Sequence, residues 1–373
     1  MTTELIPFPD ADDHGDGGPR RIATGFSGSP ADAEVVLLDE AAFDGGRQEV
    51  ALPDETELTP SAAARVADGW AASTRTGYAR DWRAFTAWCT QTSRTPLPAT
   101  AETLASYTDH LAAAGAAPAT VDRALGSIAS RHAAAGHAVS TKAARLVLRS
   151  YRREWAAAGG RTRRAPALSV EELRRMVDAA GEGLVGLRDR TLLLLGYAMM
   201  ARRSELAALN TTDLRQVPDG LEVFVATSKT DKDSAGTTVA VPYGTHLSTC
   251  PVRTVAAYLA ALAKAGVTAG PLLRSVDRHG RLAGTADAAG RGTGRMSGAG
   301  INLVVKRLAE AVGIEGVTAH SLRAGPATAA AAAGAPRAWI ARQGRWSESS
   351  TAIDSYIRPA DAWRDNPIRK VGL

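Results

Sequence analysis

The chain has 373 residues, of which 45% are hydrophobic and 22% are charged. These are values of globular proteins, so a fibrous or wholly unstructured chain is excluded, and the length suits two ordinary domains. No uninterrupted apolar run reaches the roughly 18 residues of a membrane span. Cys89 and Cys250 are too few for a disulfide framework, and the acidic N-terminus lacks the features of a signal peptide. We therefore expect a cytoplasmic protein with no membrane partner.

Charge is unevenly distributed along the chain. Residues 1–60 contain 14 acidic and 3 basic side chains, whereas the rest contains 41 basic and 25 acidic ones. A basic body behind an acidic tail favours a polyanionic partner such as nucleic acid. Arginine outnumbers lysine by 38 to 6. Most of that excess is typical of GC-rich coding, although guanidinium groups also bind phosphate through two hydrogen bonds.

The first part of the chain reads as a tail followed by a helical domain. Residues 1–56 are rich in Asp, Gly and Pro without steady periodicity, which predicts a disordered acidic tail. Residues 57–157 show helical patterning. In the first clear helix, at 74–88, four aromatic side chains fall three or four positions apart: Tyr78, Trp82, Phe85 and Trp88. Further helices are predicted at about 100–114, 118–136 and 140–157.

A basic linker, residues 158–168, leads to a second domain at 169–360 and a short tail at 361–373. Glycine and proline punctuate the linker, which contains Arg161, Arg163 and Arg164. Ser169 opens the second domain with a near capping box. Helices are expected at about 169–180, 186–199 and 202–209, then a hairpin from runs 221–227 and 237–241. Helices dominate from 251 to about 360, around a Gly/Arg-rich loop at 275–298.

Several kinds of site are unsupported by the sequence. No two histidines have metal-ligand spacing beside Cys or Glu, so a metal site is not expected. The glycine-rich stretch 289–300 lacks both a Walker lysine and a preceding strand, so it predicts no nucleotide cofactor. The Gly-x-Ser-x-Gly elbow of hydrolases is absent from the sequence.

The remaining candidates are polar groups in the second domain. Arg202 directly follows an apolar helix, and Glu205, three residues later, shares its helical face. Two of the six lysines, Lys229 and Lys232, fall in the hairpin loop. The other candidates follow later in the chain: His320 and Arg323 three residues apart, then Trp346 and Tyr356. Taken singly, each of these residues fits an ordinary cap, turn or core position.

Their order and spacing resemble the tyrosine recombinase (phage integrase) family, over about residues 60–360. The family pattern is an arginine motif, a hairpin lysine, His-x-x-Arg and a terminal tyrosine, and Trp346 is similar to the Cre-like variant. The segment Ser73–Tyr78 is similar to the opening of the family's helical core-binding domain. The resemblance implies a mainly α fold with a small β-hairpin or sheet, arranged as a two-domain C-shaped clamp around double-stranded DNA.

The resemblance also implies a role for each candidate. Tyr356, the only tyrosine after His-x-x-Arg, would attack the DNA phosphate. Lys229 would protonate the leaving oxygen, with Lys232 as the open alternative. The other roles are phosphate binding by Arg202, Arg323 and Trp346, base assistance by His320, and orientation of Arg202 by Glu205.

Binding and assembly follow from the same resemblance. DNA readout would come mostly from helices of residues 74–157, where Arg75, Arg80 and Arg83 lie off the apolar stripe, with phosphate contacts from the linker arginines. The family acts as a homotetramer on two DNA sites. Residues 361–373 would then dock on a neighbouring protomer. No cofactor, ATP or metal is expected.

Two departures from the family pattern support an alternative, a catalytically impaired DNA-binding protein of the same fold. Trp346 and Tyr356 are ten residues apart, one more than the family interval. Pro326 stands early in the helix after Arg323, where members of the family commonly carry an aromatic residue; we expect it in the first helical turn, where proline is tolerated. A topoisomerase that only relaxes DNA is the other enzymatic alternative.

Overall fold

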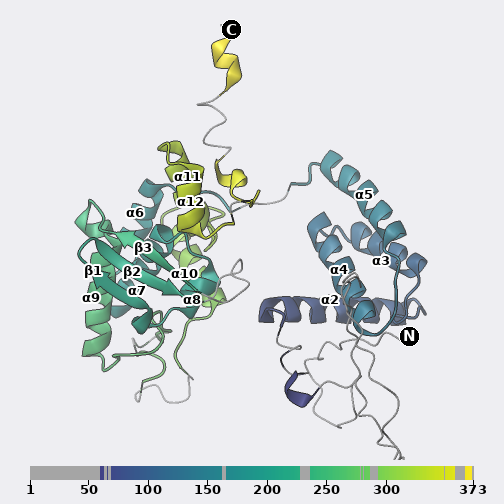
Figure 1. Cartoon of the computed structure of the whole chain (residues 1–373), viewed down its shortest axis with the longest axis horizontal. Coiled ribbons are helices and arrows are strands. Elements are labelled where there is room, and N and C mark those ends of the chain that lie inside the picture. Colours follow the sequence, from purple (N-terminus) through teal and green to yellow (C-terminus); the bar gives the residue numbers. More distant parts are fainter. Residues whose placement is uncertain are drawn as a thin grey trace, which may run out of the picture. The chain divides into compact units, whose positions relative to one another are not determined.

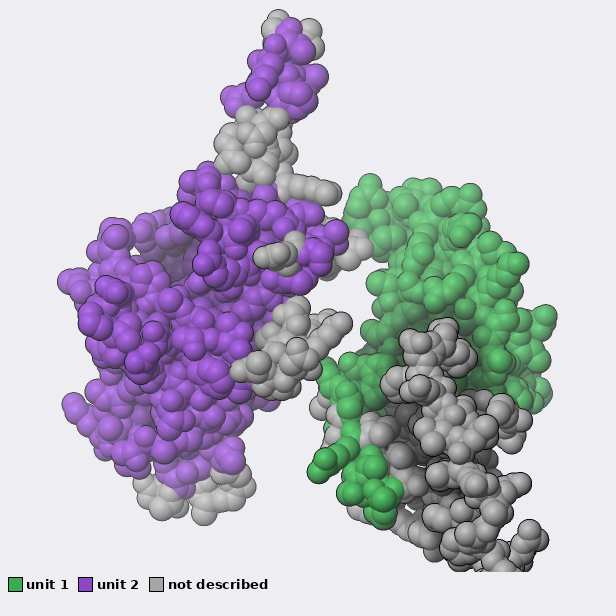
Figure 2. Space-filling view, viewed as in Figure 1, with its two compact units in different colours: residues 1–162 green, residues 163–373 purple. Residues whose placement is uncertain are grey.

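The structure is a computed structural model. It describes residues 59–62, 65, 69–161, 165–226, 236–277, 279, 281–285, 293–347, 349–357 and 366–371, so the predicted acidic tail 1–56 lies outside the described residues. The chain divides into two compact units, residues 1–162 and 163–373 (Figure 2). Each unit has its own hydrophobic core. The prediction of a mainly α fold with one small sheet is confirmed.

Unit 1 is built from helices around a single core (Figure 1). Its helices are α2 (Ala72–Gln91), α3 (Ala101–Ala113), α4 (Pro118–Ala134) and α5 (Lys142–Ala157). Helix α3 packs along α5, and α2 packs along α4. The predicted aromatic stripe on α2 faces the core, because Phe85 and Trp88 are buried and Trp82 packs against them.

Two sets of polar contacts hold α4 to neighbouring parts of unit 1, and the Asp81 and His132 side chains in them are buried. Arg123 on α4 binds Asp81 on α2 through two hydrogen bonds, from Nε to Oδ2 at 2.8 Å and from Nη2 to Oδ1 at 3.1 Å. His132 Nε2 accepts the backbone N–H of Ala99 at 2.8 Å, and its Nδ1 lies 2.8 Å from Ile128 O. Both ring nitrogens are used, so the neutral imidazole acts as acceptor and donor at once.

Unit 2 places most of its helices around a larger core. Its longer helices are α6 (Val170–Asp178), α7 (Gly183–Ala198), α9 (Pro251–Lys264), α10 (Gly298–Ala311) and α11 (Ser321–Ala332). Shorter ones are α8 (Arg203–Ala208), α12 (Arg337–Gly344), and the 3-10 turns η1 (Thr211–Asp213), η2 (Leu247–Thr249) and η4 (Pro367–Lys370). The predicted capping box at the start of α6 is present, with Ser169 and Glu172 as its partners. Helix α7 is central, because Leu192–Leu195 are buried around its whole circumference.

A three-stranded antiparallel sheet completes unit 2. Its strands, β1 (Leu214–Val217), β2 (Gly220–Val225) and β3 (Thr237–Pro242), follow in the order β1-β2-β3. The predicted hairpin corresponds to β2 and β3, with Val223 opposite Val239. The prediction missed β1, whose two central side chains are exposed, so its sequence carries no apolar alternation.

The segment between α9 and α10 is held by arginines. Helix α9 ends at Lys264, well before the loop predicted at 275–298. Arg274 is buried and donates to the carbonyls of Ala269, Pro271, Ala283 and Thr293.

In the part of the chain that the structure describes, no helix is both long and apolar enough to cross a membrane.

Candidate active site

The predicted pair Arg202 and Glu205 lies at the junction between the end of α7 and the start of α8. Met200 adopts a left-handed backbone (φ 48°), which turns the chain so that Arg202 precedes the first residue of α8. Glu205 Oε1 accepts a hydrogen bond from Arg202 Nη1 at 2.6 Å, and Oε2 accepts the backbone N–H of Arg202 at 2.9 Å. A three-residue spacing favours such a pair. The carboxylate therefore holds the guanidinium of Arg202 in one orientation.

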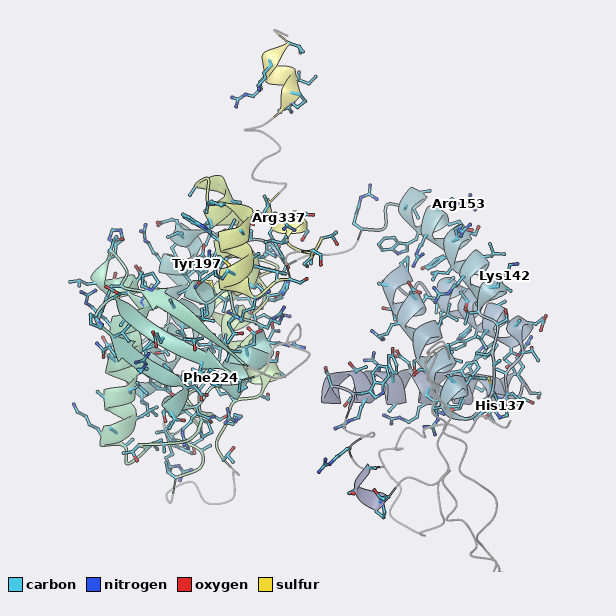
Figure 3. All side chains as sticks on the ribbon, viewed as in Figure 1. His137, Lys142, Arg153, Tyr197, Phe224 and Arg337 are labelled. Carbon is cyan, nitrogen blue, oxygen red and sulfur yellow. The ribbon has the colours of Figure 1, made fainter. Side chains whose placement is uncertain are left out.

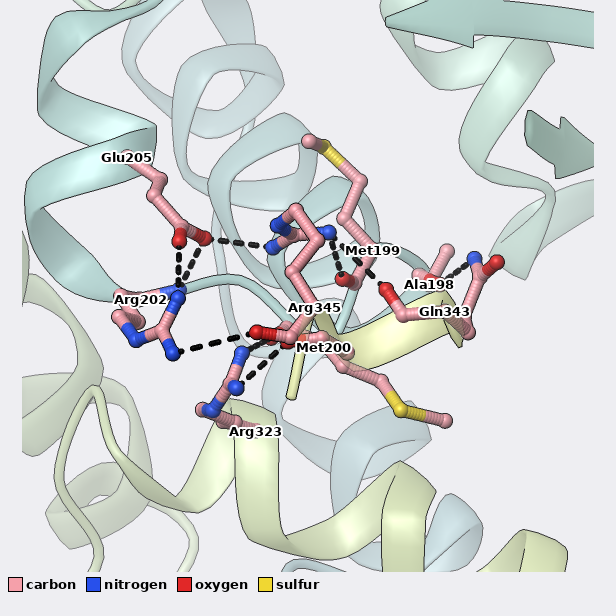
Figure 4. Close-up of polar contacts among 9 residues, drawn as sticks. Ala198, Met199, Met200, Arg202, Glu205, Arg323, Gln343 and Arg345 are labelled. Atoms are coloured by element: carbon pink, nitrogen blue, oxygen red, sulfur yellow. Dashed lines mark hydrogen bonds and ion pairs between the residues drawn. The ribbon is translucent and has the colours of Figure 1, made fainter. Parts of the chain in front are cut away.

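A third charged side chain, Arg345, joins this pair, although sequence reasoning missed it. Arg345 Nη2 donates to Glu205 Oε2 at 2.5 Å, and Nη1 donates to the carbonyls of Met199 and Gln343 at 3.1 and 2.9 Å (Figure 4). Both charged side chains are almost fully buried. Burial raises the pKa of Glu205, but the hydrogen bonds and charges of Arg345 and Arg202 outweigh it, so the pKa lies below 4.5. Glu205 is therefore an ionised buried carboxylate at neutral pH.

Helix α11 brings Arg323 to the same place. Its Nη1 and Nη2 donate to the carbonyls of Met200 and Gly344, both at 2.5 Å. The guanidinium carbon lies 3.8 Å from the ring centre of Trp346, an arrangement in which the aromatic face attracts the cation. Burial, together with the charge of Arg202, lowers the pKa of Arg323 to about 9. The side chain is thus still positively charged at neutral pH.

Two glycines, Gly325 and Gly344, let neighbouring backbone and ring atoms come close to helices α11 and α12. A Cβ on Gly325 would lie 2.2 Å from Leu168 O, and a Cβ on Gly344 would lie 1.9 Å from the ring of Trp346. Tyr197 lies at the end of α7 (Figure 3). Its hydroxyl donates to the same Leu168 carbonyl at 3.2 Å. Helix α11 can therefore lie directly against the chain at Leu168, and the ring of Trp346 can fold back over the end of α12.

Pro326 lies in the interior of α11, so the prediction that placed it in the first turn is wrong. The helix begins at Ser321, which makes Pro326 its sixth residue. Proline cannot donate the hydrogen bond that the carbonyl four residues earlier would accept. The helix nevertheless continues to Ala332, and Pro326 is buried within it.

His320, which precedes α11, lies beside Tyr356. The two are joined at 2.7 Å between His320 Nε2 and Tyr356 Oη. The surrounding protein and the charges of Arg323 and Arg202 lower the pKa of His320 below 6.5, so its imidazole is neutral at pH 7. A neutral ring nitrogen can accept the phenol proton. A cavity of about 600 Å³ opens beside His320, and it is lined by α10 and by the segment that leads from α10 to α11.

The ten-residue interval from Trp346 to Tyr356 does not keep the tyrosine away from the other groups. Tyr356 and Trp346 pack against a small cluster that includes the buried Ile353, and their ring centres are 5.6 Å apart. Thr328 on α11 donates to the carbonyl of Tyr356 at 3.2 Å. Tyr356 lies in a helical segment at 354–357, which follows a turn at 351–353.

The structure gathers most of the predicted catalytic set within unit 2: Arg202, Glu205, His320, Arg323, Trp346 and Tyr356. Other predicted residues lie outside the described ones: Arg163, Arg164, Lys229 and Lys232. The rest belong to unit 1: Arg75, Arg80 and Arg83 on α2, and Arg161 after α5. Arg80, Arg83 and Arg161 are exposed, and Arg75 is partly buried. Among the described residues, the predicted catalytic side chains therefore belong to unit 2 and the predicted DNA-binding ones to unit 1.

Comparison with known proteins identifies the family. Residues 166–362 match the Phage integrase family. The integrase/recombinase xerD homolog of Selenomonas ruminantium is 31% identical over 328 residues, which cover 86% of this chain and 91% of that protein. The chain belongs to the phage integrase family. The recombinase cre of Escherichia phage P1 is 26% identical over 168 residues, which cover 43% of this chain and 49% of that protein.

Solved structures share the fold of this phage integrase family member. XerH site-specific recombinase, in its post-cleavage complex with palindromic difH substrate, gives a TM-score of 0.51 at 14% identity, covering 83% of this chain and 82% of that one. The Tn1549 transposon integrase, in complex with transposon right end DNA, gives 0.50 at 12% identity, covering 84% and 98%. At these identities the likeness establishes the two-domain fold alone.

The family membership decides between the sequence-based alternatives. The chain is a tyrosine-type site-specific DNA recombinase, as its membership of the phage integrase family and its likeness to the two recombinases indicate. A catalytically impaired DNA-binding protein is not favoured, and the contact between Tyr356 and His320 removes the spacing argument that supported it.

Proposed function

We propose that Tyr356 cleaves DNA by direct attack on a backbone phosphate, forming a 3′-phosphotyrosyl intermediate. Its Oη forms the bond to phosphorus, the bond from phosphorus to the 5′ oxygen breaks, and the phenol proton passes to His320 Nε2. The observation that carries this proposal is the 2.7 Å contact between Tyr356 Oη and His320 Nε2, beside two arginines. Rejoining is the reverse reaction, in which a 5′-hydroxyl displaces the tyrosine.

The transition state concentrates negative charge on the non-bridging oxygens. Arg202 and Arg323 would bind these oxygens, and the indole N–H of Trp346 would donate one further hydrogen bond. The Arg202 side chain stays partly accessible, at 18%, while Glu205 binds its Nη1. The described cluster contains three arginines and one carboxylate, so its net positive charge suits a phosphate. Charge neutralisation by arginine takes the place that a metal ion would otherwise fill.

The leaving 5′ oxygen needs a proton. Lys229 would supply it as general acid, and Lys232 is the alternative donor in the same loop. The phosphotyrosine bond conserves the free energy of the broken phosphodiester, so the reaction would need neither ATP nor another cofactor.

Double-stranded DNA would be held by both units, which we propose close around it as a C-shaped clamp. Exposed arginines support this binding: Arg80 and Arg83 on α2, and Arg161 after α5, to which we add Arg75, Arg163 and Arg164. Contacts of this kind to phosphates give affinity and register, whereas base contacts give specificity.

Assembly and location are further parts of the proposal. We infer a homotetramer on two DNA sites, in which residues 361–373 dock on a neighbouring protomer. Ile368 and Val371 support the docking, because these apolar side chains are more than half exposed. Truncation after Arg358 should then abolish the tetramer while leaving DNA binding, and an intact tetramer would refute the docking.

The two free cysteines, Cys89 and Cys250, support a reducing compartment, the cytoplasm.

The test is covalent trapping on a nicked suicide substrate made from the junction DNA of the element that encodes the chain. The wild type should form a protein–DNA adduct that resists denaturation, and Tyr356→Phe should form none. Tyr243→Phe is the matched control, because Tyr243 is an exposed tyrosine of unit 2 whose hydroxyl contacts Gln216. A wild type that binds the DNA without any adduct, or an adduct that persists in Tyr356→Phe, would refute the proposal.

A further inference from the structure

Arg345 has an unusual backbone for a residue with a long side chain. It ends α12 in the left-handed conformation (φ 56°, ψ 45°), which side chains other than glycine rarely adopt. Non-glycine residues in this conformation persist when surrounding contacts impose it, and they cluster at functional sites. Arg345 lies directly between Gly344, whose carbonyl accepts a hydrogen bond from Arg323, and Trp346, whose ring covers the Arg323 guanidinium.

The Arg345 side chain joins two backbone segments on which the site depends. Its Nη1 donates to Met199 O and to Gln343 O. The residues next to these acceptors, Met200 and Gly344, provide the two carbonyls that hold Arg323. A single guanidinium thus fixes the separation of the two carbonyls that receive Arg323.

The same guanidinium fixes Glu205. Glu205 Oε2 accepts from Arg345 Nη2 at 2.5 Å, while Oε1 accepts from Arg202 Nη1 at 2.6 Å. Arg345 is therefore on one side of the carboxylate and Arg202 on the other. The carbonyl of Arg345 also lies 3.5 Å from Arg202 Nη2. Only 4% of the Arg345 side chain is accessible, against 18% for Arg202, so Arg202 is the more accessible of the two arginines that Glu205 binds.

We propose that Arg345 is a positioning residue for DNA cleavage, which acts on the scissile phosphate through Glu205 and Arg202. Its bond to Glu205 keeps that carboxylate in the place from which it orients Arg202. Its bonds to Met199 and Gln343 hold the backbone segments whose carbonyls bind Arg323. The inference rests on the proposed function, because it requires these two arginines to bind the phosphate under attack. A small displacement of a phosphate-binding group is enough to slow a reaction that depends on geometry.

The test measures adduct formation by the full-length protein at saturating suicide substrate, with DNA affinity measured separately. Arg345→Gly removes the guanidinium and suits the left-handed backbone, so the turn itself is preserved. We expect its cleavage rate to fall by roughly 100-fold, the effect of an ångström-scale misplacement, while DNA affinity stays within about threefold. Arg345→Lys retains a cation but cannot reach all three acceptors, so its rate should lie between those of wild type and Arg345→Gly.

Two further variants separate positioning from a general structural effect. If Arg345 acts through Glu205, the two losses should not multiply: Arg345→Gly should add to Glu205→Gln only the part that comes from its bonds to Met199 and Gln343, whereas independent effects would multiply. Arg274→Met is the matched control, because Arg274 is an equally buried arginine of unit 2 that binds backbone carbonyls away from Glu205. It should lower stability without slowing cleavage by the folded, DNA-bound protein.

The outcomes are distinct. A wild type without adduct refutes the proposed function itself. If the wild type forms the adduct, three results would each overturn the role of Arg345 alone. In the first, Arg345→Gly cleaves within about twofold of the wild-type rate. In the others, the losses multiply in the double variant, or Arg274→Met slows cleavage as much as Arg345→Gly does. Should Arg345→Gly fail to bind DNA, Arg345→Lys decides, because a wild-type rate with lysine shows that the forked contacts are not required.

Discussion

The role of His320 can be tested by combining one substitution with a pH titration. His320 Nε2 is 2.7 Å from Tyr356 Oη, and the surrounding protein with Arg323 and Arg202 lowers the pKa of His320 below 6.5. The neutral, proton-accepting form therefore predominates above pH 6.5. As the pH falls through the lowered pKa, the acceptor is lost, and the cleavage rate should fall about tenfold per pH unit.

The size of the effect distinguishes two roles for His320. If it only holds the tyrosine, its loss removes one hydrogen bond of about 0.5–1.5 kcal/mol, which is roughly a 2- to 13-fold change in rate. If it takes the proton during attack, its loss should cost about 10²–10⁴-fold. His320→Gln distinguishes them, because the amide oxygen can accept the phenol hydrogen bond but cannot take up the proton.

The assay is single-turnover adduct formation at saturating DNA, followed from about pH 5 to pH 8.5 to span the histidine titration. The wild-type rate should be level above pH 6.5 and decline only as the pH falls through the lowered pKa of His320, whereas His320→Gln should be slow and lack this decline. An equal decline in both proteins would assign the titration to another group. A loss below about 13-fold in His320→Gln would leave His320 with the holding role only.

Three further predictions concern the rest of the chain. Glu205→Gln should lower the free energy of unfolding by about 3–5 kcal/mol, because Arg345 stays buried without its carboxylate; urea unfolding measures this, and a loss below about 1 kcal/mol would contradict it. Burial lowers the pKa of His132 below 6.5, so its contribution to stability is complete above pH 6.5 and is lost as the pH falls, by at most about 1.4 kcal/mol per unit; thermal unfolding should show this loss in wild type but not in His132→Gln. Arg161→Ala should weaken DNA binding at all sequences and reduce the salt slope by about one, and an unchanged slope would argue against a phosphate contact.

The sequence was most informative where local rules decide the structure. The aromatic stripe of α2 follows helical periodicity, and its members Phe85 and Trp88 are buried. The capping box at Ser169 and the β2–β3 hairpin also depend on neighbouring residues alone. The short strand β1 escaped prediction because it has four residues with polar, exposed side chains at its centre, and pairing with β2 supplies the stabilisation that its own sequence lacks.

Arg345 shows what sequence reasoning cannot reach. Its acceptor Glu205 is 140 residues away, and no local pattern connects them. The chain contains 38 arginines, and no sequence pattern distinguishes the one between Gly344 and Trp346 from the others. Glu205 was predicted only as a partner of Arg202, three residues before it, because that contact is local to a helix. The buried cluster of Arg202, Glu205 and Arg345 therefore follows from the tertiary fold.

The placement of Tyr356 divides the site into a firmly held part and a lightly held one. Buried contacts to the carbonyls of Met200 and Gly344 fix Arg323, so the phosphate-binding groups are preorganised, as electrostatic stabilisation requires. Tyr356, in contrast, is only partly buried, and it is held by the contact with His320, by hydrogen bonds with Thr328 and Ile353, and by the small cluster beside it. Few buried contacts mean a low local opening free energy. An enzyme that must attack a phosphate and later release it gains from this division, because the nucleophile can withdraw while the binding groups for the phosphate stay in place.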